Sequence, residues 1–265
     1  MFRSGSLLAS AALAALLLAA PAWARELVVV IDPGHGGDQQ GAEGPEGTLE
    51  KDVALQLAKK LREELKKELG ARVLLTRERD TDLHLSERVA WANRRRPDLF
   101  ISLHANSMPT HRLRQRVQGI ETYFLSANAS GADAASTADR ENAEGPAVDR
   151  TSRGDTLAFI LDDLQRAEAH VDSSRLAYAV HQKLIEHTRA EDRGVQQAPF
   201  YVLNGLDAPA ILVEIGYISH PTEGPKLKTS AYQVKLVRAL SEGVSDFVQQ
   251  IGARDGEKLA TPQGQ

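Results

Sequence analysis

A histidine among glycines is the first residue in this sequence whose setting suggests chemistry. His35 follows the apolar run at residues 27–31 and has Gly34, Gly36 and Gly37 around it. A β-branched run that ends in glycines predicts a buried strand that stops abruptly. Glycines also let a ligand approach the backbone closely, because they carry no Cβ. His35 is therefore a candidate metal ligand at the carboxyl end of a strand, and an ordinary tight turn is the alternative.

Two further residues belong to the same predicted edge of the sheet. His104 directly follows a predicted strand at residues 98–103, and Glu50 begins the helix that returns from the first strand. Ligands of open α/β sheets bind at the carboxyl ends of the strands. Two neutral imidazoles and one carboxylate are a catalytic zinc set that leaves a fourth position for water. The chain has no cysteine, so we predict one Zn²⁺ bound by His35, Glu50 and His104.

A glutamate in an apolar strand supplies the remaining chemistry. Glu214 lies near the end of the predicted strand at residues 210–215, which is otherwise apolar. Burying a carboxylate without a partner is costly. We interpret Glu214 as a general base that takes a proton from water and later delivers it to the leaving nitrogen. A strand end that faces solvent is the alternative.

The order of the predicted elements positions these side chains. Strands and helices alternate with short connections, which is typical of parallel sheets. We expect an α/β fold, a single domain with a mostly parallel twisted central sheet flanked by helices on both faces, plus a helical insertion. Strands are predicted at residues 27–31, 72–76, 98–103, 119–125, 200–203 and 210–215, and helices at 50–69, 86–95 (with Ser86 as cap), 132–143, 156–168, 175–189 and 232–251.

A change of composition marks the insertion. Residues 126–155 are dominated by Ala, Ser, Asp, Glu and Gly, and such a stretch is too long for a simple connection in a compact domain. We assign residues 126–174 to an insertion in a domain that spans residues 25–253. A flexible surface loop is the alternative. Residues 254–265 are predicted to be a disordered polar tail.

The first 24 residues predict the compartment. They combine Arg3, an apolar stretch at residues 7–20 and the small-x-small site Ala22-Trp23-Ala24, which is the pattern of a cleavable signal peptide. An uncleaved membrane anchor is the alternative. The formal charge of −4 gives no sign of nucleic-acid binding, and no polybasic block suggests binding to anionic lipid. We expect an exported protein without stable membrane insertion.

Other polar residues are given structural roles. We expect Arg77, Arg88 and Asn93 to be buried hydrogen-bonding groups. His84 is predicted to be a packed turn residue. The remaining histidines are predicted to be solvated, namely His111, His170, His181, His187 and His220.

Together these motifs resemble the zinc-dependent N-acetylmuramoyl-L-alanine amidases. The resemblance rests on residues 31–37, Glu50, Thr76-Arg77, Arg88, Asn93, residues 102–106, residues 212–214 and residues 216–219, in the order of that family. It implies zinc on His35, Glu50 and His104, with Glu214 catalytic. The implied reaction is cleavage of the amide between N-acetylmuramic acid and L-alanine of the stem peptide in peptidoglycan.

The insertion gains a role from the same resemblance. Cell-division amidases of Gram-negative bacteria carry a helical segment at this place, which covers the site until an activator protein displaces it. By this comparison residues 126–174 are the regulatory segment, Glu141 is the residue that blocks the zinc, and Glu144 is the second choice. The resemblance implies a periplasmic enzyme, autoinhibited and involved in splitting the wall at division, with a LytM-like activator. With no additional wall-binding domain in view, targeting is expected from the catalytic domain or from a partner.

Two other functions fit parts of the pattern. The same ion and base would hydrolyse any amide, so a zinc peptidase that cuts within stem peptides is the competing enzyme. A catalytically silent wall-binding module is the competing non-enzyme, although the complete set of His35, Glu50, His104 and Glu214 argues against it.

Overall fold

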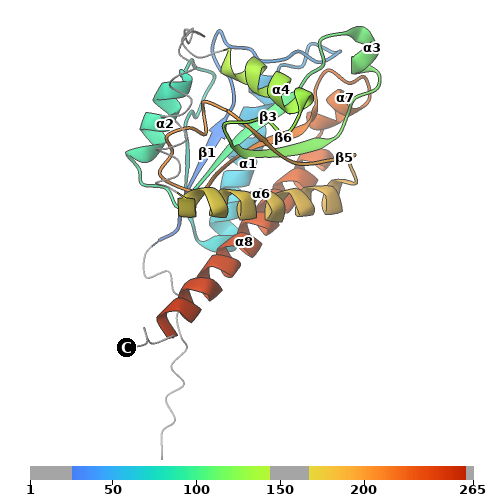
Figure 1. Cartoon of the computed structure of the whole chain (residues 1–265). Helices are drawn as coiled ribbons and strands as arrows, with labels where there is room; N and C mark the ends of the chain where they lie inside the picture. The colour runs from blue at the N-terminus through green and yellow to red at the C-terminus, as the bar shows by residue number, and fades with distance from the viewer. Residues whose placement is uncertain (1–25, 144–166, 261–265) are drawn as a thin grey trace, which may run out of the picture.

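The computed structural model describes residues 26–143 and 167–260 (Figure 1). The predicted signal peptide, Glu144 and most of the predicted helix at 156–168 lie outside these ranges. In the described ranges, no helix is both long and apolar enough to cross a membrane.

Six strands form one sheet in the described residues, in the order β2-β1-β3-β6-β4-β5. Neighbouring strands are parallel except for β4 and β6, which are antiparallel. This confirms the predicted α/β class with a mostly parallel sheet. The strands are β1 (Val28–Pro33), β2 (Arg72–Leu75), β3 (Leu99–Asn106), β4 (Ile120–Leu125), β5 (Asp192–Ala198) and β6 (Ala210–Tyr217).

Helices cover both faces of the sheet (Figure 1). Side chains of β1 alternate between the faces, so that Val29 and Ile31 join one buried cluster and Val30 joins the other. The first cluster contains side chains of α1 (Glu50–Leu69), α6 (Ala167–Thr188) and α8 (Ser230–Ala260); the second contains those of α2 (Leu85–Asn93) and α4 (Ala132–Asn142). Two short helices, α3 (His111–Arg114) and α7 (Glu223–Leu227), complete the described elements.

The edge strand β5 was missed by the sequence analysis. A strand was predicted at residues 200–203, but these residues form a turn. Phe200, Val202 and Leu203 are apolar because they are buried in the second cluster. The real strand, Asp192–Ala198, pairs only with β4 and is mostly half-buried. Its polar sequence therefore lacks the apolar run that marks a central strand.

Several helix boundaries also differ from the predictions, and α6 begins at Ala167 rather than at residue 175. Helix α8 continues to Ala260, nine residues beyond the predicted end of the closing helix at residue 251. Arg254 belongs to this extension, and its Nη1 lies 2.9 Å from Asp172 Oδ1 of α6. Helix α2 begins before Ser86, because the Glu87 carboxylate accepts a hydrogen bond from the His84 backbone N–H at 3.0 Å and so closes the first turn. His84 is exposed rather than packed.

Two histidines that were predicted to be solvated are buried. The His181 ring lies between Thr122 Oγ1, at 3.0 Å, and Asp192 Oδ1, at 2.8 Å. His220 Nδ1 accepts a hydrogen bond from the Glu223 backbone N–H at 3.2 Å. The His181 ring finds its partners through the tertiary fold, whereas the partners of His220 are local and only its burial depends on distant segments.

Candidate active site

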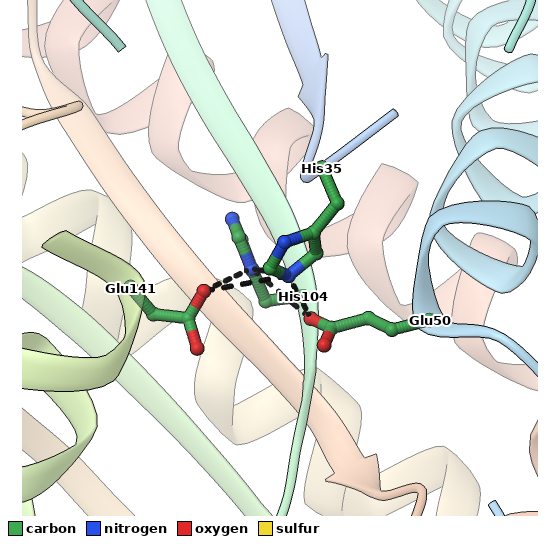
Figure 2. Close-up of side chains that lie close together, drawn as sticks. All are labelled: His35, Glu50, His104 and Glu141. Carbon is green, nitrogen blue, oxygen red and sulfur yellow. Dashed lines mark hydrogen bonds and ion pairs between the residues drawn. The ribbon is translucent and has the colours of Figure 1, made fainter. Parts of the chain in front are cut away.

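Four side chains converge at the carboxyl edge of β1 and β3 (Figure 2). Their ligand atoms, one from each of His35, Glu50, His104 and Glu141, all lie within 4.8 Å of one another. His35 Nε2 is 2.9 Å from Glu50 Oε1 and 3.4 Å from Glu141 Oε2. His104 Nδ1 is 3.1 Å from His35 Nε2 and from Glu50 Oε1. It lies 2.8 Å from Glu141 Oε2.

These distances fit a tetrahedral cation site. Ligand atoms that lie about 2.0–2.2 Å from a tetrahedral zinc are about 3.3 Å from each other, and the five separations that involve an imidazole nitrogen run from 2.8 to 3.4 Å. Hydrogen bonding alone does not require such convergence, because one imidazole proton serves one main partner at a time. Two imidazole nitrogens and two carboxylate oxygens are also ligand types that zinc accepts. The predicted ligands therefore lie together, and Glu141 supplies a fourth.

Glycines allow the two imidazoles to approach each other. A Cβ on Gly34 would lie 2.3 Å from His104 Cε1, and a Cβ on Gly41 would lie 2.6 Å from His35 Cδ2. His35 itself has a φ of 58°, a left-handed conformation that a residue with a side chain seldom adopts. The glycines around His35 thus allow the close approach that was expected there. The role of Gly41 was not predicted, because it lies in a loop without a recognisable motif.

Backbone groups orient Glu50. Its Oε1 accepts a hydrogen bond from the Ala105 N–H, and its Oε2 accepts one from the Ala42 N–H, each at 2.9 Å. Burial raises the pKa of this carboxyl, but the neighbouring charge of His35 and the hydrogen bond from His104 outweigh burial and hold the pKa well below its usual range. Glu50 is therefore held as a carboxylate, the form that binds a cation.

Arg77 ties the loop of His35 to the start of α1. Its guanidinium is buried and donates to the carbonyl oxygens of Pro33 at 3.0 Å and Gly34 at 2.7 Å. A third bond, of 2.8 Å, runs to the Lys51 carbonyl, beside Glu50. One side chain thus sets the spacing between the segments that carry His35 and Glu50.

Arg88 holds the same loop from α2. It donates to Asp32 Oδ1 at 2.9 Å and to the carbonyl oxygens of Pro33 and His35 at 2.8 and 2.7 Å. Burial raises the pKa of Asp32, but the Arg88 charge and a hydrogen bond from Thr76 outweigh it and lower the pKa. The expected burial of Arg77 and Arg88 is confirmed.

Replacing Arg88 with Lys should weaken metal binding about 10- to 100-fold, the usual effect of removing a group that orients a metal ligand. Lysine keeps the charge beside Asp32 but cannot make the forked contacts to the Pro33 and His35 carbonyls. Zinc titration against a competing chelator measures the change, with exposed Arg94→Lys as the control. Unchanged affinity in a folded Arg88→Lys variant would contradict the orienting role.

Glu214 lies beside the cluster on β6. It pairs in register with His104 on one side and with Glu121 on the other. The side chain is fully buried, so the alternative of a solvent-facing strand end is wrong. Neither carboxylate oxygen has a hydrogen-bond partner among the described residues. Burial, with the negative charge of Glu141, raises the pKa of Glu214 well above its ordinary value.

Helix α4 places Glu141 in the site (Figure 2). On one side of Glu141, Arg140 Nη2 donates to Asn106 Oδ1 at 2.5 Å. On the other side, Asn142 Nδ2 donates to the Pro199 carbonyl, and its Oδ1 accepts from the Tyr201 N–H, both at 2.8 Å. Polar contacts therefore hold α4 on both sides of the residue that reaches the cluster.

A buried carboxylate next to the site was not anticipated. Glu121 of β4 accepts four hydrogen bonds, from Arg193 Nε at 2.6 Å, Tyr123 OH at 2.7 Å, and Asn106 Nδ2 and Tyr217 OH at 3.0 Å. Its four partners come from four separate strands. Spacing along the sequence carries no signal for such a network.

Comparison with known proteins finds one family that matches most of the chain. The model of the family described as N-acetylmuramoyl-L-alanine amidase matches residues 29–246. The amidase AmiC of Escherichia coli O6:H1 is 34% identical over 238 residues, which are 89% of this chain and 55% of AmiC. This chain thus spans about half the length of that relative. AmiA of E. coli K12 is also 34% identical, over 83% of this chain and 75% of AmiA.

Solved structures show the same fold. The N-acetylmuramoyl-L-alanine amidase of Clostridium difficile 630 superposes with a TM-score of 0.64 at 28% identity, covering 84% of this chain and 97% of that one. AmiC2 of Nostoc punctiforme gives a TM-score of 0.63 at 29% identity, with the same two coverages.

Proposed function

This chain belongs to the N-acetylmuramoyl-L-alanine amidase family, and from that premise we propose that it hydrolyses peptidoglycan. The bond cleaved is the amide between the lactyl group of N-acetylmuramic acid and L-alanine of the stem peptide. One observation carries the proposal: His35, Glu50 and His104 converge on a single point beside the buried, unpaired Glu214.

The chemistry follows from this arrangement. A divalent cation, zinc by ligand type, bound by His35, Glu50 and His104 would polarise the scissile carbonyl and make water acidic enough to lose a proton near neutral pH. Glu214 takes that proton, and the carboxyl so formed delivers it to the leaving nitrogen of L-alanine. Because the Glu214 oxygens have no hydrogen-bond donor among the described residues, the water is their natural partner.

Glu141 regulates access in this proposal. Its Oε2 lies where the attacking water or the substrate carbonyl has to bind, 2.8 Å from His104 Nδ1. We assign the regulatory role to the predicted insertion at 126–174. Among its described residues, those of α4 contact the site. In this proposal substrate can bind only after α4 moves away, and docking of α4 is the autoinhibited state.

Replacing Glu141 with Ala should raise basal hydrolysis of peptidoglycan. If docking of Glu141 keeps about 90–99% of the molecules closed, its loss raises the rate about 10- to 100-fold. Release of dye from labelled sacculi measures the rate, and exposed Asp139→Ala on the same helix is the matched control. A basal rate that stays at the wild-type level would contradict autoinhibition by Glu141.

The same proposal includes a partner and a compartment. A protein activator, of the LytM-like type implied by the resemblance, displaces α4 by replacing the contacts of Arg140 and Asn142. The signal-peptide pattern at residues 1–24 directs the protein to the periplasm, where it acts in wall splitting at division.

Mass spectrometry of digested sacculi tests the reaction. An amidase releases intact stem peptides that begin with L-alanine and leaves glycan strands without peptides. A peptidase would release shortened peptides, and a silent wall-binding module would release nothing. Either of the last two results, obtained with the Glu141→Ala variant loaded with zinc, would reject the proposed reaction.

A further inference from the structure

Arg193 of β5 has two differently used edges. Its Nε donates to buried Glu121 at 2.6 Å, and its guanidinium lies 5.5 Å from the centre of the Tyr217 ring. At the terminal edge, Nη2 lies 3.3 Å from Asp133 Oδ2 of α4, and Nη1 lies 3.9 Å from Glu191 Oε1. Asp133 is 78% exposed at its side chain, whereas Arg193 is 20% exposed. Arg193 is thus held by a buried carboxylate on one side and contacts an exposed carboxylate of α4, the helix that covers the site, on the other.

Arg193 lies at a short distance from the metal cluster. Its partner Glu121 pairs in register with Glu214, which pairs in register with His104. These two strand spacings separate Glu121 from His104 by about 10 Å. The Arg193 side chain contacts Glu121 at the far end of that path. Glu121 also accepts from Asn106, two residues after His104 on the same strand. The guanidinium and the cluster therefore border the same surface beneath α4.

The contacts of α4 suggest what this surface binds. The helix places one carboxylate, Glu141, at the metal cluster and a second, Asp133, at Arg193. When α4 leaves, Arg193 keeps its bond to Glu121, while its Nη2 edge becomes available for another carboxylate. A planar guanidinium with a fixed orientation is well suited to carboxylates, because its N–H groups form a fork.

We propose that Arg193 binds a carboxylate of the stem peptide, that of the residue after L-alanine, and that Asp133 occupies this subsite while α4 is docked. In a peptide that begins at the scissile nitrogen, the carboxylate carbon of the second residue lies about 6 Å away. That length suits a span from the metal cluster to the Nη2 edge. The inference rests on the proposed amidase function and adds a group that selects substrates.

The test uses two peptidoglycan preparations that differ only in the second stem residue, with its carboxyl free in one and amidated in the other. In the zinc-loaded mature chain, kcat/KM should be about 10- to 100-fold higher for the free acid, the usual effect of a hydrogen bond to a charged group. Arg193→Lys should reduce this ratio to nearly one, mainly by losing rate on the free acid. Exposed Arg238→Lys is the control and should keep the wild-type ratio.

A second variant protects the test against misfolding. Because Glu121 is buried, Arg193→Gln alone would leave its charge unpaired, so the double variant Glu121→Gln with Arg193→Gln removes both charges together. It too should show a ratio near one. Equal cleavage of both preparations by the wild type, or a variant ratio equal to that of the wild type, would overturn the carboxylate subsite alone. Cleavage of neither preparation by the zinc-loaded Glu141→Ala variant, in which Glu141 no longer blocks the site, would reject the amidase function with it.

Discussion

Replacing Glu214 with Gln should lower turnover about 10²- to 10⁴-fold, the range for loss of a general acid–base group, and leave the metal content unchanged. Glutamine has nearly the same shape but cannot accept the proton of the attacking water. Glu214 is the neighbour of His104 across the sheet but is not one of the four converging residues. The cation site should therefore persist in the variant. Single-turnover hydrolysis of purified peptidoglycan and metal analysis of the same sample measure both quantities.

Stability provides an internal control for this variant. Burial and the charge of Glu141 raise the pKa of Glu214 in the folded, metal-free chain. A raised pKa means that the folded state binds the proton more tightly, so stability falls as pH rises above the unfolded-state pKa of a glutamate. Glutamine cannot ionise, so metal-free Glu214→Gln should melt no lower than wild type at neutral pH. Persistent turnover in this folded, metal-loaded variant would show that another group is the base.

Replacing His104 with Ala should abolish zinc binding at stoichiometric concentrations and lower hydrolysis about 10³-fold or more, because the cation supplies several kcal/mol of transition-state stabilisation. His104 Nδ1 contributes to all the short contacts of the cluster except those made by His35 Nε2 with the two carboxylates. Without His104, the Glu50 and Glu141 carboxylates would also lose a shared neighbour, and their mutual repulsion would oppose reassembly of the site.

Metal analysis after dialysis and hydrolysis of sacculi test this expectation. His111→Ala is the matched control, because His111 is exposed and is not one of the four residues of the cluster. The wild type should lose activity with a chelator and regain it with added zinc, whereas His104→Ala should not respond to zinc. If His104→Ala kept one tightly bound zinc per chain, His104 would not be a ligand.

The ligand residues on regular elements were predictable from the sequence. His35 and His104 follow apolar runs directly, and Glu50 begins a helix whose bounds, Glu50–Leu69, are those predicted. Since parallel strands end at one edge, the order of the elements alone brings these three residues together. The position of Glu214 in an apolar strand indicated burial for the same local reason.

Other features depend on contacts between segments that are distant in sequence. The polar strand β5 pairs with β4 across more than sixty positions, and the partners of Glu121 come from β3, β5 and β6 as well as its own strand. No local period or spacing reports such pairings. The burial of His181 and His220 was missed for the same reason.

The sequence by itself determined the type of fold, the edge where the chemistry lies, and the residues His35, Glu50, His104 and Glu214, because apolar runs and glycines act over a few neighbouring positions. The resemblance had named Glu141 ahead of Glu144, and only the tertiary structure placed Glu141 in the cluster and Arg193 against α4. Docking of a polar helix depends on donors and acceptors supplied by other segments, and these meet only once the chain has folded.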